Sequence, residues 1–324
     1  MQYEIVPSRY LRRSLLMPSR AIITKFAFIA AVASGCATPS QTAVAQSAPA
    51  SAWATTDAAL GRTGAAQPGG VMKYSFPRGD LQVTAGGVLL KPALALGSWV
   101  AFRPMAGGHS MVMGDLVLAE DEVTAVMRAL QAGGVEQTAL HNHVLHESPR
   151  VMYMHISAHG DAADIARTIR TALATTRTPL GPPSAPAAAS AADLDTAGIA
   201  RALGVAGKLN GVVYQMSVPR AEIIREGSEE IPASMGVATA INFQPTGGGK
   251  AAITGDFVMR ASEVNDVIRA LQQGGIESTA LHSHMLMEEP RLFFMHFWAN
   301  DDAVRLAGVL HSALAKTNSA IAPR

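Results

Sequence analysis

The sequence predicts an α+β fold made of two tandem copies of one domain, each an antiparallel sheet covered by helices on one face. The first observation is an internal repeat. Shifted by 141 residues, positions 114–157 align without a gap with positions 255–298, and 24 of the 44 pairs are identical. The second is that strand-like stretches alternate with amphipathic helical ones in each copy. The third is a proline-rich segment that separates the copies.

The repeat and its surroundings divide the 324 residues into five parts. We expect an export signal with a lipobox at 1–36, a flexible tether at 37–56, a first domain at 57–177, a linker at 178–192 and a second domain at 193–318. The prolines in the linker exclude a helix or a central strand there. We therefore expect two separate domains, each with its own core, that a protease releases by cutting the linker.

Hydrophobic periodicity places the elements within each copy. Apolar residues recur with helical spacing at 123–130, and Gly133-Gly134 is typical of the end of such a helix. The second copy repeats this helix at 264–271, and a further helix is expected after Asp161. Strands are predicted at 72–76, 99–102, 111–118, 135–145 and 151–157.

Charge and cysteine content exclude two kinds of interaction. A net charge of +1 with 16% charged residues gives no electrostatic footprint for nucleic acid, so we expect no nucleic-acid partner. A single cysteine excludes an intramolecular disulfide, and stability must come from the hydrophobic cores.

The first residues have the features of an export signal. Basic residues precede an apolar run at 26–33 that is too short to span a bilayer. This run leads into Ala33-Ser34-Gly35-Cys36, which is similar to a bacterial lipobox and would make Cys36 the lipidated residue. A competing cleavage site at 43–45 would release the protein instead, and Met17 is an alternative start. We expect an exported protein of the cell envelope or periplasm, with the membrane as partner through the lipid anchor.

Three histidines recur in each copy on what the sequence predicts to be a β-hairpin. A turn centred near Ser148 would place His141 opposite His155 and His143 opposite Tyr153, all on one face. The alternate residues, which are mostly apolar, would lie on the other face beneath the helices. The equivalent histidines of the second copy are His282, His284 and His296.

Imidazoles at this spacing can converge on one divalent ion. We predict one ion in each copy, zinc or another divalent metal, with the three histidines as its ligands. The arrangement is similar in geometry to the three-histidine zinc site of α-type carbonic anhydrases. No other part of the chain resembles that family. The alternative is a set of half-buried histidines that hydrogen-bond to their neighbours without a metal.

Four further residues are candidates for a role at these sites. Asp115 and Asp256 each follow a glycine and would either support the metal or belong to a turn. Glu147 and Tyr153 are the candidate catalytic residues for moving a proton, if the metal activates water. The alternative for Glu147 is an ion pair across the turn with Arg150.

The first copy resembles the LppY/LpqO family of bacterial lipoproteins. The resemblance covers nearly the whole of both copies, and its most specific strings are Thr138-Ala-Leu-His-Asn-His and Ser148-Pro-Arg-Val-Met-Tyr-Met-His. It implies an exported, lipid-anchored protein and implies no reaction. The second copy departs from the family with Ser283 and with Phe294 in place of Tyr153, which argues against an active second site.

Three functions remain open at this point. The first is a metal-binding protein of the cell envelope. The second is a metal-dependent hydrolase or lyase. The third is a metal-free envelope protein in which the two histidine faces meet across a pseudo-twofold axis, as a cleft for a small molecule or as a plain interface.

Overall fold

The computed structural model describes residues 50–181 and 193–320, which belong to one compact unit. The predicted export signal, Cys36 and most of the tether and linker lie outside the described residues. Within them, no helix has the length and apolar character that crossing a bilayer requires.

The two copies have the same α+β topology, as predicted from the repeat. The first sheet has the strand order β1 (Ala65–Gln67), β2 (Val71–Pro77), β5 (Gly97–Pro104), β6 (Ser110–Ala119), β8 (Val151–Gly160) and β7 (Glu136–His141). The second has the order β9 (Lys208–Asn210), β10 (Val213–Pro219), β13 (Ala238–Gly247), β14 (Lys250–Arg260), β17 (Leu292–Asp302) and β15 (Glu277–His282). All neighbouring strands in both sheets are antiparallel.

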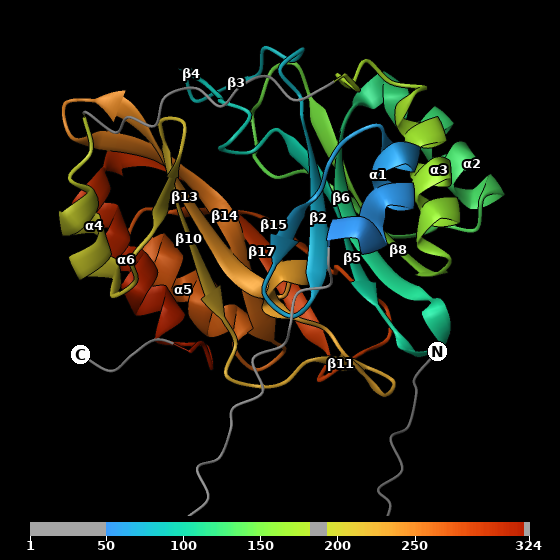
Figure 1. The fold of residues 1–324 in the computed structure, drawn as a ribbon. Coiled ribbons are helices and arrows are strands. Elements are labelled where there is room, and N and C mark those ends of the chain that lie inside the picture. The colour runs from blue at the N-terminus through green and yellow to red at the C-terminus, as the bar shows by residue number, and fades with distance from the viewer. Residues whose placement is uncertain (1–49, 182–192, 321–324) are drawn as a thin grey trace, which may run out of the picture. The chain divides into compact units, whose positions relative to one another are not determined.

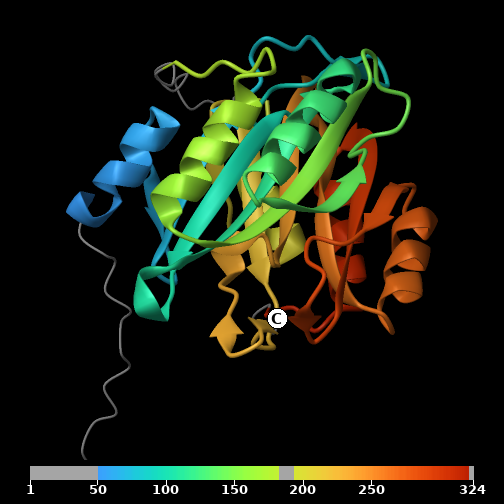
Figure 2. The same ribbon diagram turned by 90° about the vertical axis from the view of Figure 1, so that its right-hand side faces the viewer.

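Each sheet has helices on one face, which confirms the predicted fold class (Figures 1 and 2). The helices are α1 (Ala54–Leu60), α2 (Val123–Ala132) and α3 (Ala162–Leu173) in the first copy, and α4 (Thr196–Leu203), α5 (Val264–Gln273) and α6 (Ala303–Leu314) in the second. The sequence did not predict α1 and α4, which are short. The smaller elements are β3 (Thr84–Ala85), β4 (Val88–Leu89), β11 (Arg225–Glu226), β12 (Glu229–Glu230) and β16 (Glu288–Glu289), with 3-10 turns at Ala50–Trp53, Ala106–Gly108, Glu120–Glu122 and Ala233–Met235.

The alternation of side chains along the strands explains how two cores form in each copy. On β2, Tyr74 and Phe76 belong to the cluster beneath α1, α2 and α3, whereas Val71 belongs to a different cluster on the opposite face. That second cluster also contains residues of the other copy, such as Met235 and Phe294. Each sheet is therefore buried on both faces, by its own helices and by the other repeat.

Each copy has its own core beneath its helices, as predicted, but the expectation that the copies share no core is wrong. A further cluster joins Val83 and Tyr153 of the first copy to Ala252 of the second. Two equivalent hydrogen bonds also cross between the copies: Thr138 Oγ1 donates to the His284 carbonyl at 2.6 Å, and Thr279 Oγ1 to the His143 carbonyl at 2.5 Å. The proline-rich linker permits separate domains, but the apolar inner faces bury each other instead.

The predicted hairpin register is also wrong, by two residues. His141 lies opposite Tyr153, and His155 lies opposite Ala139. Strand β7 ends at His141, well before the predicted position 145, because the connection is a long loop and not a tight turn. Ser148 in this loop exchanges two backbone hydrogen bonds with Thr84, each of 2.9 Å, which holds the loop against β3.

Candidate metal centre

All six predicted histidines lie in one cluster that both repeats build. His141 and His282 end the edge strands β7 and β15, and their ring centroids are 3.8 Å apart. His143 lies 3.7 Å from His296, and His155 lies 3.8 Å from His284, again by ring centroids. Every one of these contacts joins the first copy to the second. The structure thus merges the two predicted triads into one histidine cluster.

The cluster follows an approximate twofold symmetry that relates the two copies. His141 and His155 have ring centroids 5.0 Å apart, and their equivalents His282 and His296 are 4.7 Å apart. The symmetry extends to the flanking aromatic rings. His143 stacks on Tyr153 at 3.3 Å, and His284 stacks on Phe294 at 3.5 Å. The duplicated sequence therefore builds the two halves of one site.

Three groups in the cluster have ligand atoms close enough to share an ion, within 4.8 Å of one another. They are His141, His155 and His282; His141, His143 and His296; and Asp256, His282 and His296. The first two groups each combine residues of both copies. Histidine groups of this kind can hold a metal ion.

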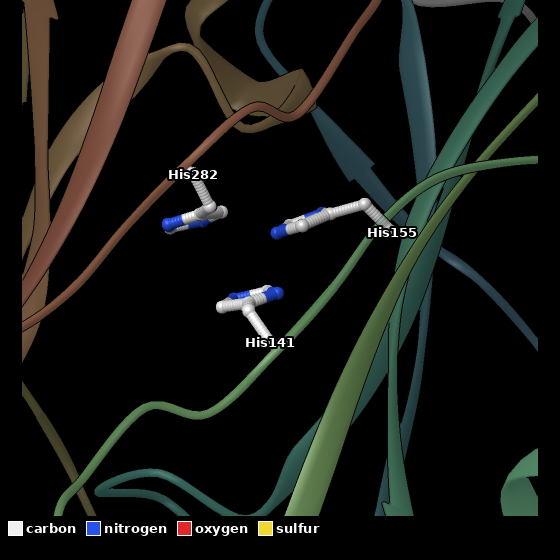
Figure 3. Close-up of side chains that lie close together, drawn as sticks. All are labelled: His141, His155 and His282. Atoms are coloured by element: carbon white, nitrogen blue, oxygen red, sulfur yellow. The ribbon is translucent and has the colours of Figure 1, made fainter.

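Figure 3 shows the first of these groups, with two rings from the first repeat and one from the second. The three ring planes lie within 15° of parallel. Since a coordinated ion lies in the plane of each imidazole, coordination by all three requires rotations about χ2. That torsion is soft in histidine, and His141 and His282, whose Nδ1 atoms have no hydrogen bond, can rotate without breaking a bond to the backbone.

Backbone carbonyls fix the orientation of three rings. His296 Nδ1 donates to the Gly255 carbonyl at 2.7 Å, and His284 Nδ1 donates to the Gly236 carbonyl at 2.9 Å. His155 has a hydrogen bond to the backbone of Gly114, the equivalent of Gly255. Because a carbonyl can only accept, the proton lies on Nδ1, and Nε2 presents its lone pair to the cluster. Metal-binding histidines are held in this way.

His284 has two close contacts at one ring nitrogen. Its Nε2 atom lies 3.1 Å from His282 Nε2 and 2.8 Å from Asp256 Oδ2. With one proton already on Nδ1, a neutral His284 has one lone pair on Nε2, and His282 Nε2 can donate a hydrogen bond to it. A cation in the cluster would offset the approach of Asp256 Oδ2 to the same lone pair. On the other side of the cluster, His141 Nε2 and His296 Nε2 are also 3.1 Å apart.

Burial keeps the imidazoles in the neutral form that binds metals. It lowers the pKa of His155 to about 3 and that of His284 to about 4, and for His155 the neighbouring His284 lowers the pKa further. The pKa values of the other four histidines are lowered as well, again mainly by burial. Burial also raises the pKa of Asp256, to about 7.

Asp115 and Asp256 lie within strands, so the alternative that they belong to turns is wrong. Asp115 is on β6 directly opposite His155, and its Oδ2 atom lies 3.4 Å from His143 Nε2. The glycines that precede the two aspartates are required by a close approach of strands. A Cβ atom on Gly255 would lie 1.9 Å from the Ala240 carbonyl oxygen, and one on Gly114 would lie 2.8 Å from that of Trp99.

Glu147 and Tyr153 both lie beside the first half of the cluster. Glu147 Oε1 accepts from the Val151 N–H at 3.1 Å, while its Oε2 is buried without a partner. Burial raises the pKa of Glu147 to about 7. The Tyr153 hydroxyl is also buried without a partner, and burial, followed by Glu147 and Asp115, raises its pKa well above the usual range.

Sequence reasoning missed two features of this site. Thr138 and Thr279 cross-link the repeats through the carbonyls of histidines in the cluster, and the repeated Thr-Ala-Leu-His string was the signal for them. Lys73 lies with Nζ 3.9 Å from the Trp99 ring, where burial lowers its pKa to about 8 and Asp115 partly offsets that effect. Lys73 and Trp99 are not repeated in the second copy, so the sequence did not mark them as part of the site.

Comparison with known proteins identifies the family. The family described as Domain of Unknown Function (DUF1259) matches residues 54–175 and 197–316, and the chain belongs to it, with two copies of the domain. The comparison with curated proteins gave no match.

Two solved structures match at low similarity. The trimeric bacterial microcompartment shell protein PduB covers 75% of this chain and 86% of its own, with 14% identity and a TM-score of 0.17. EtuB from Clostridium kluyveri covers 78% of this chain and 90% of its own, with 12% identity and a TM-score of 0.18. Scores this low do not establish a shared fold.

Proposed function

We propose that this two-copy member of the Domain of Unknown Function (DUF1259) family is a metal-binding protein whose site is shared between its repeats. One observation carries the proposal. His155, His284 and His296 each make a hydrogen bond to the backbone through one ring nitrogen. His284 and His296 also have Nε2 atoms that lie 3.1 Å from the Nε2 atom of another histidine. Neutral imidazoles held in this way are preorganised metal ligands.

Zinc is the ion that these ligands favour. Imidazole nitrogens with one carboxylate are a typical zinc donor set, and the nitrogen atoms lie about 2.0–2.1 Å from the metal. Two such nitrogens on a tetrahedral ion are roughly 3.4 Å apart. The two Nε2 pairs at 3.1 Å approach that separation before any ring rotates.

An ion in this position would connect the two repeats. His141, His155 and His296 are each no more than 8% exposed, so the ion would lie mostly buried at the interface. Sites closed by protein ligands are characteristic of structural zinc. We therefore place stabilisation of the joined repeats first among the roles of the metal.

Metal analysis of protein purified without a polyhistidine tag tests this proposal. We expect bound zinc, and a melting temperature that rises by several degrees with added zinc. An ion that binds only the folded state stabilises it by about 2.7 kcal/mol at a hundredfold excess over Kd.

His141→Ala should reduce the zinc-dependent rise, because His141 belongs to two of the three groups and only the group of Asp256, His282 and His296 remains. His159→Ala is the matched control, since His159 lies on β8 with a side chain that is 39% exposed. Untagged protein without metal, whose melting temperature zinc leaves unchanged, would contradict the proposal. The stacked rings would then be a metal-free interface.

Export and lipid anchoring remain part of the proposal. Their support is the sequence around Cys36 and the resemblance to the LppY/LpqO lipoproteins. On this proposal the repeats lie in the cell envelope or periplasm and are tied to the membrane by the lipid on Cys36.

A further inference from the structure

The two halves of the histidine cluster are built from equivalent positions but carry different chemistry. The first-repeat end comprises Asp115, His143, Glu147 and Tyr153. The second-repeat end comprises the equivalent residues Asp256, His284, Glu288 and Phe294.

Polar atoms without partners gather at the first-repeat end. They are Asp115 Oδ1, Glu147 Oε2, the Tyr153 hydroxyl and His143 Nε2, which has no hydrogen bond although it lies 3.4 Å from Asp115 Oδ2. Tyr153 is 0% exposed, so water from the bulk does not satisfy its hydroxyl. A buried polar group without a hydrogen bond is destabilising, and four in one place indicate a missing binding partner.

The second-repeat end is closed by the protein itself. Both oxygens of Glu288 are bonded, to the Leu292 N–H at 2.9 Å and to Arg291 at 3.1 Å. Phe294 has no hydroxyl group to satisfy. His284 has partners on both ring nitrogens. Among these four residues, only Asp256 Oδ1 lacks a partner, and the equivalent Oδ1 atom of Asp115 lacks one too.

The same difference extends to the ligand groups. Asp256 belongs to one of the three groups, so the second-repeat end can supply its own carboxylate oxygen to an ion. The group at the first-repeat end consists of three histidines, His141, His143 and His296. A tetrahedral zinc ion with three histidine ligands retains a fourth position for a non-protein ligand.

We infer that the first-repeat end is a binding site for a small ligand that coordinates the metal through oxygen and carries N–H or O–H donors. The inference rests on the proposed metal site. The two carboxylates require donors on the ligand, and the Tyr153 hydroxyl can donate to the ligand's oxygen. Water is the smallest molecule of this class, and hydroxamates are larger members.

Cobalt-loaded protein allows the site to be tested with acetohydroxamate as the probe. We expect the visible spectrum of the bound cobalt to change saturably as the probe is added. Tyr153→Phe should weaken probe binding about tenfold, the effect of one lost hydrogen bond. This variant should fold, because the second repeat already has phenylalanine at the equivalent position.

Tyr74→Phe is the matched control, because it removes the hydroxyl of another buried tyrosine, which donates to Asp57 at 2.7 Å. Its affinity for the probe should equal that of the wild type. Cobalt that binds without any response to acetohydroxamate would overturn this inference and leave the metal proposal intact. Equal probe affinity in Tyr153→Phe would also overturn it. Failure of the wild type to take up cobalt would overturn the metal proposal and the inference together.

Discussion

A pair of buried arginines shows what single residues contribute to this fold. Arg78 is 0% exposed, and its guanidinium donates to Asp80, to Glu122 and to the Val117 carbonyl. Arg220 makes the equivalent contacts in the second copy. Each of these arginines follows a proline, but the sequence could not show that they are buried or which carboxylates they meet.

Replacing Arg78 should therefore be costly. Arg78→Met leaves Glu122, which is 4% exposed, with only the exposed Arg177 as a cation, and we expect the free energy of unfolding to fall by about 3–5 kcal/mol. Urea unfolding followed by circular dichroism measures the change. Arg167→Met is the control, because the side chain of Arg167 is 61% exposed, and its effect should stay within about 0.5 kcal/mol. Similar losses for the two variants would show that the buried network contributes little.

The histidines of the site were predictable one by one. The repeat selected the same three positions in each copy, and strand parity placed His141 and His155 on one face even though the register was wrong by two residues. What could not be predicted is that His141 meets His282. Contacts between the copies decide which faces of the two sheets pack together. These contacts leave no periodic pattern in the sequence.

At the scale of elements, equivalent carboxylates join a strand to the helix that follows it. Glu263 accepts from the Arg260 N–H at 2.7 Å and from the Asn318 N–H at 2.9 Å, and it is paired with Arg220. Glu122 does the same in the first copy, with the Ala119 and Arg177 N–H groups. These contacts hold the starts of α5 and α2 and the chain that follows the last helix of each copy.

Acid should release this second-copy network. Burial raises the pKa of Glu222, but hydrogen bonds from Arg220 outweigh burial and lower it to about 2, and Arg220 lowers the pKa of Glu263 in the same way. Because the folded pKa values lie below the unfolded value of about 4.3, this stabilisation is present above that pH and is lost as pH falls towards 2.

The check is the free energy of unfolding measured from pH 5 to pH 2. Its slope against pH should be shallower in Glu222→Gln than in the wild type, because one coupled carboxylate has been removed. An unchanged slope would mean that Glu222 titrates alike in the folded and unfolded chain.

Edge strands account for the elements that sequence reasoning placed least well. Strand β7 was predicted to bury its apolar alternate residues, yet Leu140 is 43% exposed and its equivalent Leu281 on β15 is 53% exposed. Central strands β6 and β8 matched their predicted ranges closely, since both of their faces are covered. A strand at the edge of a sheet is covered less completely, and an apolar side chain does not by itself indicate burial there.

At the scale of the whole molecule, the repeats form one compact unit. Two hydrophobic clusters contain residues of both copies, and hydrogen bonds such as that from the Lys91 N–H to Gln244 cross between them. The sequence correctly predicted two tandem sheets. It missed their association because a proline-rich linker excludes neither outcome.

Cutting the linker tests this association. A protease site inserted between 182 and 192 should be cleaved to give two fragments that still elute together in gel filtration under native conditions. Their shared apolar clusters and hydrogen bonds remain after the backbone is cut. Uncleaved protein is the control for size, and fragments that elute separately would show that each repeat is self-sufficient.

The proposed lipid anchor acts on the molecule as a whole. Cys36→Ser should leave the protein exported but move it from the membrane fraction to the soluble periplasmic fraction, since no other cysteine can receive the lipid. Fractionation followed by immunoblotting measures the shift. Unchanged association of the variant with membranes would rule out the anchor at this residue.

The central claim is that both repeats together build one metal site. Changing His282 and His296 to alanine in one chain disrupts all three ligand groups, although every histidine of the first copy remains. We predict that equilibrium dialysis against zinc shows complete loss of the wild-type binding, with circular dichroism confirming that the variant is folded. If the folded variant still binds an ion with wild-type affinity through His141, His143 and His155, each repeat has its own site and the shared centre is contradicted.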